Sequence, residues 1–184
     1  MPAPILIACV GNADVAGDDL GPRVARRLRE RRPADFEVVD LGSAPGRLLD
    51  MLGGRRTLII VDAVIGHPRF DGPLIDLEWP TASPVRSAAP RRSTHGLSIA
   101  DQLELAERLD LLPPHVRIVG WQVNGAGVIH GVADAAVDRV VARIIEHGTS
   151  TLGPAAASRR LTAMETYDDV AQCQARGRMG GGPG

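Results

Sequence analysis

The sequence of 184 residues lacks lysine altogether and is poor in aromatic residues and cysteine. All 21 basic residues are arginines, and the net charge of −1 predicts no general attraction to nucleic acid or to a membrane surface. Because aromatic residues make up 3% of the chain, its core must be built from Val, Ile, Leu and Ala. The two cysteines, Cys9 in an apolar run and Cys173 in a polar tail, exclude a disulfide framework and a cysteine-rich zinc site.

Long apolar runs are also missing. No segment approaches the 18 consecutive apolar residues of a membrane span. Residues 1–5 show no basic stretch followed by an apolar one, so we expect no secretory signal and a cytoplasmic location. The length fits one domain, which we expect over residues 1–148 of a monomer, followed by a disordered tail over 149–184 where the apolar periodicity stops.

Short apolar runs alternate with segments of helical periodicity. The patterns predict helices over 21–32, 45–52, 97–109 and 133–145, and strands over 5–10, 36–41, 57–64, 72–77 and 116–121. Pro73 favours a sheet edge for the fourth of these strands, and residues 79–94 form a long loop. This alternation predicts a three-layer α/β sandwich, with a mostly parallel, twisted sheet of about five strands flanked by helices.

Three polar residues stand out by their positions in this pattern. Asp18 follows the first strand, Asp62 ends the apolar run 58–61, and His95 opens a helical segment. Because the carboxyl ends of parallel strands lie at one edge of a sheet, we expect these side chains to converge there. Two carboxylates and an imidazole can bind a divalent transition metal and leave positions open for a substrate.

Each of these residues also has a purely structural explanation. Asp18 or the adjacent Asp19 can cap the following helix, where a carboxylate is favoured. Asp62 can accept hydrogen bonds within the turn that follows its strand, and His95 can pack at the start of its helix. Their shared place in the fold is what favours a functional site.

Other functional classes find less support. Residues 11–16 read Gly-Asn-Ala-Asp-Val-Ala and lack the glycine fingerprint of dinucleotide-binding loops. Carboxylates at the start of the next helix would also repel a pyrophosphate. The nucleophile elbow of α/β-hydrolases is missing as well. Asp14 and His67 are weaker candidates for the same site.

Five segments carry a resemblance to a known family. They are Gly11-Asn12, Asp18-Asp19-Leu20-Gly21-Pro22, Asp40-Leu41-Gly42-Ser43-Ala44-Pro45-Gly46, Leu58-Ile59-Ile60-Val61-Asp62-Ala63 and Ser93-Thr94-His95-Gly96-Leu97-Ser98. In this order and spacing they resemble the hydrogenase maturation endopeptidases, peptidase family M52. The resemblance spans about residues 4–147; each motif is weak alone, but the ordered set is fairly specific.

The resemblance implies a protease that trims the C-terminal extension of a nickel–iron hydrogenase large-subunit precursor after nickel insertion. It implies that nickel arrives with the precursor and serves as the recognition feature. It further implies that Asp18, Asp62 and His95 are the metal-binding and catalytic residues. A non-catalytic nickel-sensing or scaffold protein and a nucleotide-binding module are the alternatives. Whether nickel activates the attacking water or docks the substrate is left open by the sequence.

The chain departs from the family pattern in two places. The family usually reads Asp-Asp/Glu-Gly-x-Gly where this chain reads Gly-Asp-Asp-Leu-Gly over 17–21. Counting from Asn12 assigns the metal ligand to Asp18, whereas matching the pair of carboxylates assigns it to Asp19. Residues 122–125 replace a stretch that usually carries Pro-Glu, which bears on substrate choice.

Overall fold

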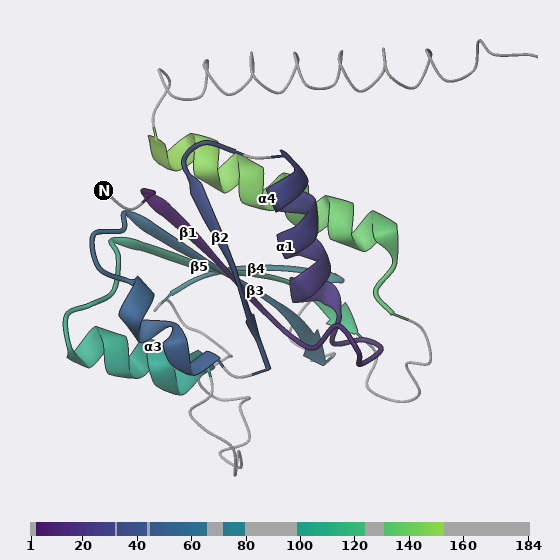
Figure 1. The fold of residues 1–184 in the computed structure, drawn as a ribbon, viewed down its shortest axis with the longest axis horizontal. Helices are drawn as coiled ribbons and strands as arrows, with labels where there is room; N and C mark the ends of the chain where they lie inside the picture. The colour runs from purple at the N-terminus through teal and green to yellow at the C-terminus, as the bar shows by residue number, and fades with distance from the viewer. Residues whose placement is uncertain are drawn as a thin grey trace, which may run out of the picture. The chain divides into compact units, whose positions relative to one another are not determined.

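A computed structural model of the chain describes residues 3–31, 33–43, 45–65, 72–79, 99–123 and 131–152. Strands and helices alternate along most of this part of the chain (Figure 1). The elements are, in order, β1 (Ile5–Val10), α1 (Leu20–Arg31), β2 (Phe36–Gly42), η1 (Pro45–Arg47), η2 (Leu49–Met51), β3 (Thr57–Ile65), β4 (Leu74–Glu78), α3 (Ile99–Arg108), β5 (His115–Val123) and α4 (Asp134–Leu152).

The strands form one five-stranded sheet in the order β2-β1-β3-β5-β4. The β1–β2, β1–β3 and β3–β5 pairs are parallel, and β4 runs antiparallel to β5. The predicted mostly parallel sheet of five strands is therefore confirmed, with β4 at the edge that Pro73 indicated. Because four strands run the same way, their carboxyl ends share one edge of the sheet.

Helices cover both faces of this sheet, which makes three layers (Figure 1). On one face, α1 buries Val24, Ala25 and Leu28, and ion pairs join it to α4. On the other face, η1, η2 and α3 cover a core cluster made of Leu6, Ala8, Val10, Leu48, Leu52, Leu58, Ile60, Trp79, Leu103, Ala106, Val116 and Ile118. Aliphatic residues dominate this cluster, as the scarcity of aromatic residues requires.

Two elements differ from the sequence prediction. Residues 45–52 form two 3₁₀ turns, η1 and η2, in place of one short helix. A segment this brief, with Gly46 near its start, cannot offset the cost of starting an α-helix. The last helix continues to Leu152, beyond the predicted end at 145, and the hydroxyls of Thr149 and Ser150 donate hydrogen bonds to the Glu146 carbonyl.

The chain divides into two compact units, residues 1–145 and 146–184. The predicted disordered tail falls mostly outside the described residues, as does most of the predicted loop over 79–94, so both stay predictions. Within the part of the chain that the structure describes, no helix is long and apolar enough to cross a membrane.

Gly21 lets α1 lie against the end of β1. A Cβ atom at this position would stand 2.0 Å from the carbonyl oxygen of Val10, far closer than van der Waals contact allows. A side chain here would push the start of α1 away from the sheet. Since Asp18 and Asp19 lie just before this point, the contact also sets where they stand.

We predict that Gly21→Ala destabilises the protein by about 1–3 kcal/mol, because the added methyl group overlaps backbone atoms that cannot rotate away. Inside an unconstrained helix the same change would stabilise by about 1 kcal/mol. Urea denaturation measures the difference. Gly53→Ala is the matched control, since nothing lies within 4 Å of its added Cβ. Equal stability of Gly21→Ala and the native chain would contradict the close approach.

Candidate functional site

The turn after β1 is closed by its own backbone hydrogen bonds. Asn12 N–H donates to the Asp18 carbonyl at 2.9 Å, and Asp18 N–H donates to the Val15 carbonyl at 3.0 Å. Gly11 makes this closure possible, with a φ of 136° that residues bearing a side chain rarely adopt. A Cβ atom at Gly11 would stand 2.2 Å from the Asp18 carbonyl oxygen. The turn therefore holds Asp18 beside the carboxyl end of β1.

Asp62 lies on the neighbouring strand β3, at the same edge of the sheet. Side chains alternate between the faces of a strand, so Asp62 shares a face with Leu58 and Ile60 of the core cluster. Its partner in the register of β5 is Gly120, where a Cβ atom would stand 2.5 Å from the Asp62 carbonyl oxygen. The position across from Asp62 is thus kept free of a side chain.

The two carboxylates lie within range of each other's charge. Burial and, after it, the charge of Asp18 raise the pKa of Asp62 to about 7, against a hydrogen bond from the Ala63 backbone that lowers it. Burial also raises the pKa of Asp18, as does the charge of Asp19, while a hydrogen bond from the Asn12 backbone opposes the rise. The Asp62 side chain keeps some contact with solvent, but protein atoms form most of its surroundings.

The structure therefore brings together two of the three residues that the sequence indicated, Asp18 and Asp62. His95 and the weaker candidate His67 lie outside the described residues. Asp14 is exposed, and its backbone N–H donates to the Asn12 side chain at 3.0 Å. The functional roles of Asp18, Asp62 and His95 stay predictions.

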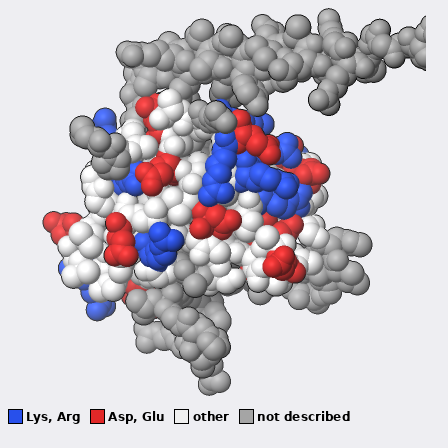
Figure 2. All heavy atoms as spheres, viewed as in Figure 1, with Lys and Arg blue, Asp and Glu red and all other residues white. Residues whose placement is uncertain are grey.

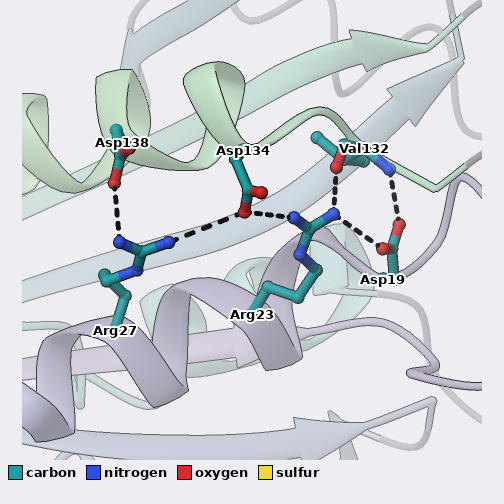
Figure 3. Close-up of polar contacts among 6 residues, drawn as sticks. All are labelled: Asp19, Arg23, Arg27, Val132, Asp134 and Asp138. Atoms are coloured by element: carbon teal, nitrogen blue, oxygen red, sulfur yellow. Dashed lines mark hydrogen bonds and ion pairs between the residues drawn. The ribbon is translucent and has the colours of Figure 1, made fainter. Parts of the chain in front are cut away.

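Asp19 has a different set of partners from Asp18 (Figure 3). One carboxylate oxygen accepts a hydrogen bond from the Val132 N–H at 2.9 Å, and the other accepts one from the Arg23 side chain at 3.1 Å. These bonds join the start of α1 to the segment before α4. The sequence had instead indicated that this carboxylate could cap the helix. Arg23 and Val132 were not identified from the sequence, although Asp19 and Arg23 have the i, i+4 spacing of a helical ion pair.

A cation fits the chemistry of the carboxylate pair. Two carboxylates that share a partly buried position repel each other, and a divalent ion between them would offset that repulsion. Among the described residues, no group of three His, Cys, Asp or Glu side chains could hold a metal ion. A third ligand would have to come from elsewhere, and His95 is the residue that the sequence indicates.

We predict that Asp62→Asn stabilises the protein more as the pH rises. The folded chain raises the pKa of Asp62 from 3.8 to about 7, so the folded state keeps a proton that the unfolded chain releases near pH ~4. The stability linked to this proton is fully present below pH ~4 and is lost as the pH rises through about 7. Asparagine has no such proton, so its advantage should grow between pH 4 and 7 and level off above.

Urea denaturation of both proteins at intervals from pH 4 to 8 measures this advantage. Asp50→Asn serves as the control, because Asp50 is exposed on η2 and its replacement should leave the pH dependence unchanged. An Asp62→Asn advantage that stays constant with pH would contradict the raised pKa.

Comparisons with known proteins agree on one family. The sequence model of the hydrogenase maturation protease family matches residues 22–151. The hydrogenase 2 maturation protease of Escherichia coli strain K12 is 25% identical over 160 residues, which covers 80% of this chain and 94% of that protein.

Solved structures of related proteins share the fold, as two of them show. The hydrogenase maturating endopeptidase HybD of E. coli has a TM-score of 0.65 at 24% identity, covering 80% of this chain and 91% of its own. The [NiFe] hydrogenase maturation protease HybD of Thermococcus kodakarensis has a TM-score of 0.57 at 22% identity, covering 79% and 98%. The family match, which spans most of the sheet and its helices, confirms the resemblance seen in the sequence. This chain belongs to the hydrogenase maturation protease family and is an endopeptidase of hydrogenase maturation.

Proposed function

We propose that this protease removes the C-terminal extension of a nickel–iron hydrogenase large-subunit precursor once nickel has been inserted. In this proposal Asp18, Asp62 and His95 bind the nickel ion that the precursor carries. The observation that supports it most is the carboxylate pair, because Asp18 and Asp62 stand together at the carboxyl edge of the sheet despite their repulsion. Sites in α/β folds of this kind form at that edge.

The position of α3 supports the inclusion of His95. Six residues separate the end of α3 from the start of β5, and β5 starts at the amino edge of the parallel strands. Since Leu103 and Ala106 pack on the core cluster, α3 lies along the sheet and its first residue, Ile99, points toward the carboxyl edge. His95 precedes Ile99 by four residues, and an extended chain of four residues spans at most about 14 Å.

The Asp62 side chain and α3 also lie on the same face of the sheet. Asp62 shares its face of β3 with Leu58 and Ile60, and α3 covers that same face. A histidine just before α3 can therefore approach the carboxylates without crossing the sheet. Carboxylate oxygens and an imidazole nitrogen together suit a divalent transition metal such as nickel.

The carboxylates suggest why the precursor would supply the metal. The raised pKa of Asp62 means that this carboxyl is largely protonated below neutral pH, so the free enzyme would bind a cation weakly. Nickel already held by the precursor brings the substrate's own ligands with it and tolerates a weaker contribution from the enzyme. A peptide carbonyl placed beside the ion would be polarised toward attack by water.

The direct test is the mass of the precursor before and after incubation with this protein. We expect the nickel-loaded precursor to lose its C-terminal segment and the nickel-free precursor to keep it. Unchanged mass of the loaded precursor would contradict the proposed reaction. Equal trimming of both forms would support protease activity but would contradict the recognition of nickel.

We predict that Asp18→Ala, Asp62→Asn and His95→Ala each abolish trimming while the fold is kept. Each change removes one proposed ligand, and Asp18 and Asp62 both keep some exposure to solvent, so the fold should tolerate their replacement. Mass spectrometry of the precursor reports activity, and circular dichroism reports the fold. Asp50→Asn is the matched control, an exposed carboxylate on η2 that should trim normally. Normal trimming by Asp18→Ala would reject the Asp18 assignment and favour Asp19.

A further inference from the structure

Asp19, Arg23 and Val132 form a polar connection between the start of α1 and the segment before α4, which we term the Asp19 clamp (Figure 3). Asp19 accepts hydrogen bonds from the Val132 N–H at 2.9 Å and from Arg23 at 3.1 Å. Arg23 in turn donates to the Val132 carbonyl and to the Asp134 carboxylate. Both polar backbone groups of Val132 are therefore bound by side chains from the start of α1.

The clamp is more enclosed than an ordinary surface ion pair. The side chain of Asp19 is 14% exposed and that of Arg23 is 23% exposed. Gly131 leaves the necessary space, because a Cβ atom there would stand 2.6 Å from an oxygen of the Asp19 carboxylate. Hydrogen bonds that involve charged groups in partly buried positions are stronger than exposed ones, so the clamp should hold Asp19 in one orientation.

Asp19 shares a peptide bond with Asp18, so the clamp reaches the proposed site through the backbone. While Asp19 is held toward Val132, the preceding carboxylate stands near Asp62. On the other side of Asp18, the bonded turn holds its backbone through Asn12 and Val15. The position of Asp18 is thus determined from both directions along the chain.

We propose that Asp19 and Arg23 are positioning residues for trimming, which hold Asp18 in place beside Asp62 without touching the substrate. This inference rests on the proposed function. A reacting group displaced by about 1 Å can lose roughly 100-fold in rate. Loss of the clamp should therefore lower the rate of the chemical step and weaken the contact of Asp18 with the nickel that the precursor carries.

Arg27 offers a matched comparison within the same helix. It pairs with Asp134 at 3.6 Å and with Asp138 at 3.4 Å, so it also joins α1 to α4. These contacts do not include Asp19 or Val132. Figure 2 shows arginine and acidic side chains gathered on the face that carries α1, and the side chains of Arg23 and Arg27 are 23% and 34% exposed. If Arg23 only joined α1 to α4, as Arg27 does, its removal would leave kcat unchanged.

The test compares kcat and KM for trimming of the nickel-loaded precursor by Asp19→Asn, Arg23→Ala and Arg27→Ala. We expect kcat to fall about 10–100-fold in the first two, with a rise in KM from the weaker nickel contact, and Arg27→Ala to retain native kcat and KM. Arg23→Lys should recover part of the rate, because one ammonium group can reach only some of the acceptors. Native kcat in both clamp variants, or an equal loss in Arg27→Ala, would overturn the proposal.

A second readout does not depend on the substrate. The Asn12 amide proton is bonded to the Asp18 carbonyl, so its hydrogen exchange reports whether the Asp18 backbone is held. We expect faster exchange in Asp19→Asn and Arg23→Ala and unchanged exchange in Arg27→Ala. If the native protein fails to trim the precursor but exchange follows this pattern, the proposed function fails while the clamp stands. Unchanged exchange in the clamp variants would reject the clamp itself.

Discussion

The close approach of α1 to the end of β1 is the constraint on which the rest of the site depends. Gly21 permits it, since any side chain there would meet the Val10 backbone, and Gly11 permits the turn that joins the two elements. Once helix and strand are this close, the intervening residues have little freedom. Asp18 is then carried to the carboxyl edge of the sheet, beside the strand that bears Asp62. Gly11 and Gly21 thus determine the position of the Asp18 carboxylate through the close backbone contacts that they allow.

The arrangement keeps two like charges together, which is unfavourable for an isolated protein. Burial, and after it the charge of Asp18, raises the pKa of Asp62 to about 7, so the ionised form of this carboxyl is disfavoured. Perturbed carboxyl groups of this kind gather at functional sites, where a ligand offsets the penalty. A substrate that carries a cation would do so, as in the proposed trimming of a nickel-loaded precursor. The family match favours such an enzyme over a non-catalytic scaffold or a nucleotide-binding module.

Local patterns carried most of what could be predicted from the sequence. Apolar runs bounded by turn residues predicted β1 and β3, and the general rule for parallel sheets predicted that Asp18 and Asp62 would lie at the same edge. The bond from Asp19 to Val132 could not be predicted, because it joins residues 113 positions apart and depends on how closely Gly131 lets the chain approach. The 3₁₀ turns over 45–51 were missed for a related reason, since packing and not periodicity decides so short a segment.

The proposed function requires that Asp18, Asp62 and His95 share one nickel ion. Anomalous diffraction at the nickel absorption edge, from crystals of this protein soaked in Ni²⁺, tests it most directly. We expect a peak at the carboxyl edge of the sheet, with an oxygen of each aspartate and a ring nitrogen of His95 within about 2.0–2.2 Å, as for comparable divalent ions. A peak elsewhere, or His95 on the opposite face of the sheet from Asp62, would contradict it.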